Sequence, residues 1–171
     1  MLGKIVIEGD VPDNVDMVDP NTMNLVAEVS VYSVQTFNSS GHPRICVLDC
    51  GLKLNQLRCL VARGARVDVV PWNHPLDTCH YDGLFLSNGP GDPQTCGASV
   101  DQIRRVINTS PPDSPTPIFG ICLGHQLLAV AAGCDTYKLK YVVPKIKFMY
   151  LFRDQYIHLN ILLDIIDASL F

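Results

Sequence analysis

The stretch that decides the fold is residues 118–133, IFGICLGHQLLAVAAG. The apolar run at 118–121 is typical of a short buried strand, and the segment after Cys122 is typical of an apolar helix. Gly120 and Gly124 flank Cys122 at two residues on either side. A residue held at a tight strand-to-helix turn has a strained backbone, and glycines at both flanking positions remove the clash between its neighbours. The pattern therefore predicts a nucleophile elbow at Cys122.

Three consequences follow for Cys122 if the elbow forms. Its sulfur projects from the edge of the sheet, and it lies at a helix N-terminus, where the positive end of the dipole favours negative charge. The backbone amide of Leu123 points into the same space and can donate to an oxyanion. The alternative is an ordinary strand-to-helix junction with incidental glycines and a buried cysteine. It stays open because the chain has six other cysteines.

Short apolar runs alternate with segments of helical spacing upstream of the elbow. We expect strands near 45–48, 67–70 and 83–87, and helices over 52–64 and around 100–107. Such alternation is typical of βαβ units, so the expected fold is an α/β three-layer sandwich with a mostly parallel sheet. Right-handed crossovers place the carboxyl ends of parallel strands at one edge, where ligands bind.

A second motif, Asn88-Gly89-Pro90-Gly91-Asp92-Pro93, follows the expected strand at 83–87. Two glycines around a proline make a rigid turn with exposed backbone amides. These amides suit a carboxylate, a carbonyl or an oxyanion. The alternative is a purely structural turn, but the expected position on the same sheet edge as Cys122 favours a functional one.

Composition limits the class of protein. The 171 residues include 47% hydrophobic and 18% charged residues with a net charge of −4, which is typical of one globular domain and disfavours a nucleic-acid partner. The seven cysteines contain no C-x-x-C pair and follow no secretory segment, so we expect reduced thiols in the cytoplasm. No stretch is apolar enough to predict a membrane span. Neither a metal nor a cofactor is expected.

A cysteine nucleophile needs a general acid, usually a histidine that a carboxylate orients. His125 follows Cys122 by three residues, and the turn aims the two side chains apart, so a structural role is favoured. His74 and His80 lie in a loop that the pattern does not place. His158 has no carboxylate two residues after it. The residues alone therefore reveal no convincing base.

Several stretches resemble the class I (triad) glutamine amidotransferases, namely GICLGHQLLAVAAG and LFLSNGPGDP. RICVLDCGLKLNQLRCLVARGARVDVVPW and GICLGHQLLAVAAGCDTYKLKY resemble more narrowly the glutaminase domain of carbamoyl phosphate synthetase, in the form found in the eukaryotic multifunctional pyrimidine-synthesis protein. VDPNTMNLVAEVS is similar to the segment that joins a preceding small domain to that domain. The resemblance covers roughly residues 10–141.

This resemblance implies hydrolysis of L-glutamine to glutamate and ammonia through a thioester on Cys122. It implies that the amides of Leu123 and of the turn from Gly89 to Gly91 hold the oxyanion. Gly89, Gly91, Leu123 and Gln126 would contact the bound glutamine. The implied partner is a carbamoyl phosphate synthetase domain or subunit that accepts the ammonia.

The resemblance also implies boundaries. We expect a remnant of the small domain and a linker at 1–42, a partial amidotransferase domain at 43–141, and a divergent tail at 142–171. In the family, a histidine and a glutamate in H-x-E spacing come after the stretch that this chain resembles. Residues 142–171 do not contain them. The tail is typical of a truncated or alternatively spliced product or of a gene-model error, so a weak or inactive glutaminase is expected.

Two other interpretations remain open. The chain could be a non-catalytic fragment that binds glutamine or a synthetase. It could also be a cysteine hydrolase of the same fold that recruits His74, His80 or His158.

Overall fold

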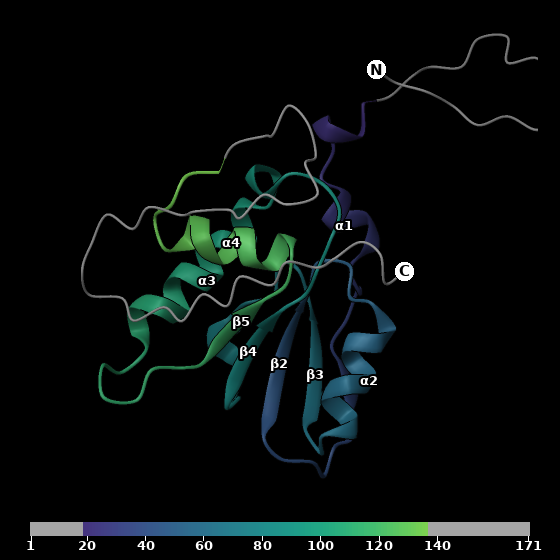
Figure 1. The fold of residues 1–171 in the computed structure, drawn as a ribbon, viewed down its shortest axis with the longest axis vertical. Helices are drawn as coiled ribbons and strands as arrows, with labels where there is room; N and C mark the ends of the chain where they lie inside the picture. The colour runs from purple at the N-terminus through teal and green to yellow at the C-terminus, as the bar shows by residue number, and fades with distance from the viewer. Residues whose placement is uncertain (1–18, 137–171) are drawn as a thin grey trace, which may run out of the picture.

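The computed structural model describes residues 19–136, which form an α/β fold around one five-stranded sheet (Figure 1). The strand order is β1-β3-β2-β4-β5. β1 pairs antiparallel with β3, and the other pairings are parallel. The strands are β1 (Gln35–Phe37), β2 (Arg44–Asp49), β3 (Arg66–Pro71), β4 (Gly83–Leu86) and β5 (Ile118–Gly120).

Helices lie on both sides of the sheet. Figure 1 shows α2 on one side and α3 and α4 on the other, with α1 beside one end of the strands. The helices are α1 (Leu25–Val29), α2 (Leu54–Ala62), α3 (Gly97–Thr109) and α4 (Leu123–Ala131), and short 3-10 turns are η1 (Pro20–Thr22), η2 (Leu76–Thr78) and η3 (Pro93–Thr95).

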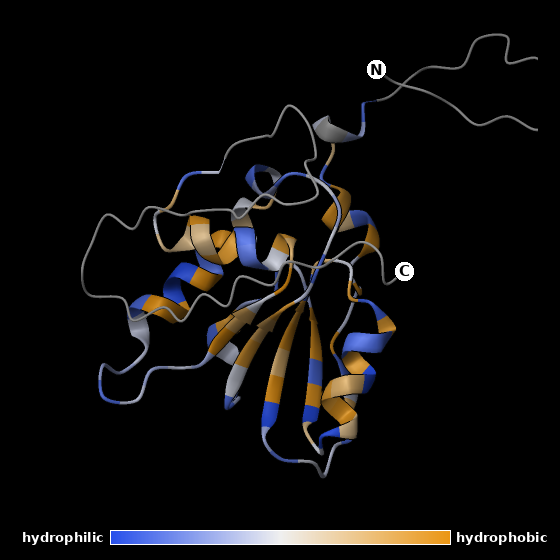
Figure 2. Cartoon of the chain, viewed as in Figure 1, coloured by the Kyte–Doolittle hydropathy of each residue, from blue (hydrophilic) through white to orange (hydrophobic). Residues whose placement is uncertain are grey.

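Alternation along the strands divides the core into two layers. On β2, Cys46 and Leu48 face α3 and α4, whereas Val47 faces the layer that contains Leu57 of α2. Because both faces are covered, the parallel strands are nearly continuous apolar runs, and Figure 2 colours them mainly as hydrophobic. The helices instead show hydrophobic and hydrophilic bands in Figure 2, since each buries one stripe.

One polar cluster fixes the antiparallel edge. Asp68 is 5% exposed on β3. It accepts hydrogen bonds from Thr36 Oγ1 of β1 at 2.6 Å and from Arg44 Nε of β2 at 2.5 Å, and Arg66 lies beside it at 3.3 Å. Burial raises the pKa of Asp68, but the bonds from Thr36, Arg44 and Arg66 outweigh burial and lower that pKa from its ordinary value. This carboxylate therefore joins three strands.

The structure confirms the expected α/β fold with its mostly parallel sheet, and the expected strands and helices lie within a few residues of their predicted bounds. β1 and α1 were not predicted. Both lie before residue 42, yet β1 pairs with β3, and Val26 of α1 is completely buried. The domain boundaries stay a prediction, and residues 142–171 lie outside the described residues.

Candidate active site

Cys122 is held in a backbone conformation that few residues other than glycine adopt. Its φ is +52° and its ψ is −110°, and it caps the N-terminus of α4. Such a conformation costs about 1–3 kcal/mol and persists only where the surroundings impose it. Here Ile121 N donates to Leu86 O at 3.0 Å, and Gln126 N donates to Cys122 O at 3.1 Å. The strained residue is therefore tied to β4 on one side and to α4 on the other.

The two flanking glycines are required by close backbone approach. A methyl group on Gly120 would lie 2.6 Å from the carbonyl carbon and oxygen of Gly124. A methyl group on Gly124 would overlap Leu86 O and would lie 2.6 Å from Leu86 C and 2.7 Å from Ser87 O. The neighbours that clash are backbone atoms, which cannot rotate away. The predicted reason for both glycines is confirmed.

The Gly-Pro-Gly turn after β4 lies against the elbow, as the sheet-edge argument predicts. A methyl group on Gly89 would overlap Cys50 O and would lie 2.8 Å from Leu123 Cδ2. Gly91 has a φ of +88° and lies next to Leu25 of α1. The ends of β2 and β4 and the start of α4 therefore meet at one edge.

A buried carboxylate that sequence reasoning missed organises the turn after β2. Asp49 is 4% exposed. Its Oδ1 accepts from Gly51 N at 2.9 Å and from Leu52 N at 2.7 Å, and its Oδ2 accepts from Val31 N at 2.8 Å. The available signal was an aspartate that ends a strand two residues before a glycine, which is typical of an Asx turn.

Ser87 joins this turn to the one that carries Gly89. It is completely buried at the end of β4. Its hydroxyl accepts from Cys50 N at 2.9 Å and donates to Asn88 O at 2.8 Å. Asp49 and Ser87 thus fix the relative position of the two turns beside Cys122.

Exposure separates Cys122 from the cysteines that are buried in the core around the sheet. Burial raises the pKa of Cys46 to about 12 and also raises the pKa of Cys50, Cys96 and Cys134. Those four thiols are poor nucleophiles near neutral pH. Cys122 is exposed and stands at the edge where the strands end. It is therefore the thiol that a bound ligand can reach at this edge.

Two histidines of the described region, His42 and His74, make contacts away from the elbow. His74 Nε2 lies 3.4 Å from Cys79 Sγ, and His42 Nδ1 lies 3.6 Å from Asp82. His125 is half-buried on α4, and burial lowers its pKa. The contacts of His42 and His74 are thus with Asp82 and Cys79 and not with the Cys122 thiol. His158 lies outside the described residues.

The other predicted site residues lie around the elbow. Leu123 is the first residue of α4 and is 1% exposed. Gln126 follows on the same helix and is half-buried. The amide of Leu123 is at the first position of a helix, where N–H groups lack intrahelical acceptors. The ligand contacts assigned to Gly89, Gly91, Leu123 and Gln126 stay predictions.

Two kinds of feature are absent from the described region. Residues 19–136 contain no group of three or more histidine, cysteine or acidic side chains placed to hold a metal ion. The same residues contain no helix with the length and apolar character to cross a membrane.

The elbow, the facing Gly-Pro-Gly turn and the parallel sheet agree with the family that the sequence matches. The profile described as "Glutamine amidotransferase class-I" matches residues 46–159. The chain belongs to this family, which confirms the resemblance inferred from the motifs.

The proteins to which the chain is similar include carbamoyl phosphate synthases and a protein named as multifunctional. The chain is 46% identical over 141 residues to "Multifunctional protein CAD" of Squalus acanthias, which covers 82% of this chain and 6% of that protein. It is 47% identical over 148 residues to "Carbamoyl phosphate synthase arginine-specific small chain" of Yarrowia lipolytica, which covers 82% of this chain and 33% of that one. The chain thus spans a third or less of these relatives.

Two further likenesses are found, one to a curated protein and one to a solved structure. The chain is 44% identical over 139 residues to "Carbamoyl-phosphate synthase [ammonia], mitochondrial" of Aquarana catesbeiana, covering 81% of this chain and 9% of that protein. Among solved structures, the chain is similar to a protein assigned as one of the GMP synthase subunits of Thermoplasma acidophilum. The likeness covers 57% of this chain and 49% of the other chain. The TM-score is 0.48 and the sequence identity is 28%.

Proposed function

We propose that the domain binds L-glutamine at the edge formed by Cys122 and the Gly89–Gly91 turn, and that Cys122 attacks the side-chain amide. The observation that carries the proposal is the exposed thiol held at φ +52° against a glycine turn from the neighbouring strand. One relative is named for ammonia, so similarity alone does not fix the nitrogen donor. The cysteine at the elbow favours glutamine.

In the proposed reaction, the Cys122 sulfur forms a bond to the side-chain amide carbon. The amide of Leu123 and amides of the Gly89–Gly91 turn stabilise the oxyanion of the tetrahedral intermediate. Collapse of this intermediate breaks the carbon–nitrogen bond and releases ammonia, which takes up a proton, and leaves a glutamyl thioester. Water then hydrolyses the thioester to glutamate and restores the thiol.

We expect slow turnover from the 171-residue chain. His42 and His74 make their contacts away from the Cys122 thiol, so we expect neither residue to protonate the leaving ammonia. Loss of a triad member in other enzymes reduces turnover by roughly 10⁴–10⁶-fold. The same observation favours the second candidate function, a fragment that binds glutamine or a synthetase without hydrolysis.

The proposed partner is a carbamoyl phosphate synthetase domain or subunit that takes up the ammonia. The names of the relatives support this partner, because they include a small chain of carbamoyl phosphate synthase. A cytoplasmic location stays a prediction that cell fractionation tests.

The test is ammonia release from L-glutamine by the full chain. We expect slow release that Cys122→Ser abolishes and that Cys59→Ser leaves unchanged, since Cys59 is an exposed thiol on α2 away from the elbow. Release that survives Cys122→Ser contradicts the catalytic proposal. Glutamine binding by calorimetry without any release supports the binding fragment instead.

A further inference from the structure

The hydroxyl of Ser87 joins two hydrogen bonds that run in one direction. Ser87 is completely buried and directly follows β4. Cys50 N donates to Ser87 Oγ at 2.9 Å, and Ser87 Oγ donates to Asn88 O at 2.8 Å. Because a backbone N–H can only donate, the hydroxyl must accept from Cys50 and keeps its own proton for Asn88 O. The chemistry of the three groups therefore fixes the direction of both bonds.

The carbonyl that receives the Ser87 proton belongs to the same peptide unit as Gly89 N–H. This peptide bond is trans. In a trans peptide the C=O and the N–H point in opposite directions. Since Asn88 O is held on the buried hydroxyl, Gly89 N–H is directed away from the interior. Gly89 itself is half-exposed, so its N–H faces the side from which a ligand arrives.

Close packing places this N–H beside the elbow. A methyl group on Gly89 would overlap Cys50 O and would lie 2.8 Å from Leu123 Cδ2. Leu123 directly follows Cys122 and begins α4. No hydrogen bond within residues 19–136 uses Gly89 N as its donor, so this N–H is free to donate to a ligand.

We propose that Ser87 is a positioning residue that aims Gly89 N–H at the side-chain oxygen of bound glutamine. The inference rests on the proposed function, in which amides of this turn stabilise the oxyanion. Ser87 acts through the Asn88–Gly89 peptide and not on the substrate itself. Its bond to Asn88 O also polarises that peptide, because hydrogen bonds in a chain strengthen one another. Gly89 N–H thus becomes a fixed donor, as an oxyanion site requires.

Ser87→Ala removes both bonds of the hydroxyl and frees the Asn88–Gly89 peptide to rotate. Ser99→Ala is the control matched for burial. Ser99 is also completely buried, and its hydroxyl donates to Trp72 O at 2.6 Å. Each variant loses one buried hydroxyl, but Ser87→Ala alone loses the group that holds Asn88 O.

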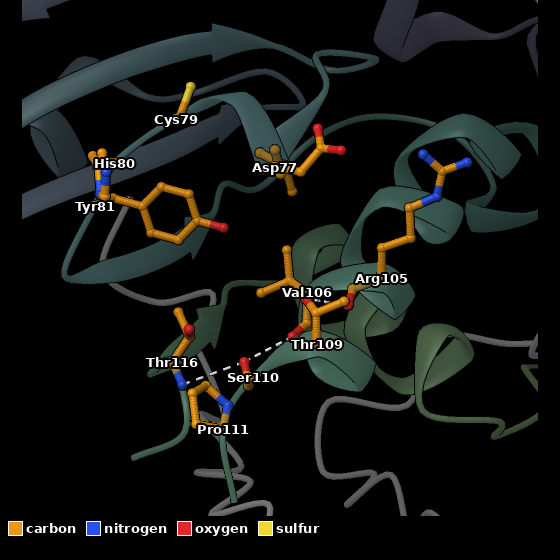
Figure 3. Close-up of a pocket in the computed structure, with 11 residues that line it drawn as sticks. Asp77, Cys79, His80, Tyr81, Arg105, Val106, Thr109, Ser110, Pro111 and Thr116 are labelled. Carbon is orange, nitrogen blue, oxygen red and sulfur yellow. Dashed lines mark hydrogen bonds between the residues drawn. The ribbon is translucent and has the colours of Figure 1, made fainter.

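A second control is matched for the pattern of bonds. Ser110 Oγ donates to Val106 O at 2.7 Å and accepts from Thr116 N at 3.4 Å, so it also links a backbone donor to a backbone acceptor. Figure 3 shows these bonds beside a cavity of about 290 Å³. Thr116 precedes β5, so this site is at the amino ends of the strands, opposite the elbow. Ser110→Ala should therefore leave the chemistry of Cys122 unchanged.

The experiment measures the addition of Cys122 to the nitrile analogue of L-glutamine, in which C≡N replaces the side-chain amide. The sulfur bonds to the nitrile carbon, one carbon–nitrogen π bond breaks, and the nitrogen takes that electron pair and the thiol proton to give a thioimidate. The negative charge that develops on nitrogen takes the place of the oxyanion, and no group leaves. Intact mass and peptide mapping of the full chain follow the adduct. We expect Ser87→Ala to slow the addition by about 10²-fold, the lower end of the effect of one lost oxyanion donor. Both control variants should react at the wild-type rate.

Alkylation of Cys122 by iodoacetamide separates the orientation of the donor from the reactivity of the thiol. This reaction displaces iodide from a saturated carbon and forms no anion for Gly89 N–H to hold. We expect the wild-type chain and Ser87→Ala to be alkylated at Cys122 at equal rates. If Ser87→Ala slows alkylation as much as addition to the nitrile, the hydroxyl acts on the thiol or on the fold and the proposal is wrong. Equal effects of Ser87→Ala and Ser99→Ala on the addition also overturn it.

Amide relaxation in NMR tests the orientation of Gly89 N–H without a ligand. We expect an order parameter of about 0.85 for this N–H in the wild-type chain and below about 0.6 in Ser87→Ala. A wild-type chain that forms no adduct contradicts the proposed function, whereas an order parameter that Ser87→Ala leaves unchanged contradicts the role of Ser87. If Ser87→Ala does not fold, Ser87→Cys replaces it, because the thiol fills the buried space but donates only weakly. It should lower the rate of addition and the order parameter in the same direction.

Discussion

Replacing Gly124 by alanine tests whether the elbow is held by backbone contact. The added methyl group would overlap Leu86 O and would lie 2.6 Å from Leu86 C and 2.7 Å from Ser87 O. These atoms belong to β4 and its end, which pairs with β2 and β5, so they cannot move without disturbing the sheet. Overpacking of this kind costs about 1–3 kcal/mol and sometimes more. We take the upper value, about 3 kcal/mol, because all three close atoms are backbone.

A helical alanine partly offsets that cost. Alanine is favoured over glycine in a helix by about 1 kcal/mol, which leaves a net destabilisation of about 2 kcal/mol for Gly124→Ala. For a chain of this size, 1 kcal/mol shifts the midpoint of thermal unfolding by about 2–4 °C, so the expected decrease is roughly 4–8 °C. Calorimetry or denaturant unfolding of the full chain measures it.

Gly97→Ala is the matched control and should change stability in the opposite direction. Gly97 is the first residue of α3, and a methyl group added there meets nothing within 4 Å. The same substitution should therefore stabilise the chain by up to about 1 kcal/mol. If Gly124→Ala lies within about 0.5 kcal/mol of the wild-type chain, the contact between α4 and β4 does not hold the elbow.

Two further predictions concern strain and charge. Cys122→Gly should stabilise the chain by about 1 kcal/mol in urea unfolding, because glycine tolerates φ +52° and ψ −110°. Cys122→Ala keeps the strained backbone and should have a stability near that of the wild-type chain. Equal effects of the two substitutions would show that the conformation stores no strain. The pKa of Asp68 is lowered in the folded chain, so its contribution to stability is present above the unfolded value of about 3.9 and is lost as pH falls through the lower folded value. Asp68→Asn should therefore flatten the loss of stability below about pH 4, and an unchanged acid profile would contradict the assigned role of its bonds to Thr36 and Arg44.

The features that sequence predicted depend on neighbours along the chain. Gly120, Cys122 and Gly124 lie within one turn, and the same local spacing that identifies the elbow also determines its geometry. The apolar strands were equally visible, because burial on both faces leaves continuous apolar runs such as Ile45 to Leu48.

The features that sequence missed depend on contacts between distant residues. β1 has only three residues, two of them exposed, and it exists because it pairs with β3 and because Thr36 donates to Asp68. The three bonds of Asp49 include one to Val31, eighteen residues earlier. No periodicity along the chain records such pairings.

The proposed role of Cys122 is that of a thiol poised to attack the side chain of bound glutamine. Its sharpest test is labelling of the full chain by a glutamine analogue with an electrophilic carbon in place of the side-chain amide, followed by peptide mapping. Alkylation releases no ammonia and therefore does not depend on a base for the leaving group. We predict one label, on Cys122, at a rate that L-glutamine reduces. Equal labelling of Cys59 and Cys122, or labelling that excess glutamine does not slow, would contradict this role.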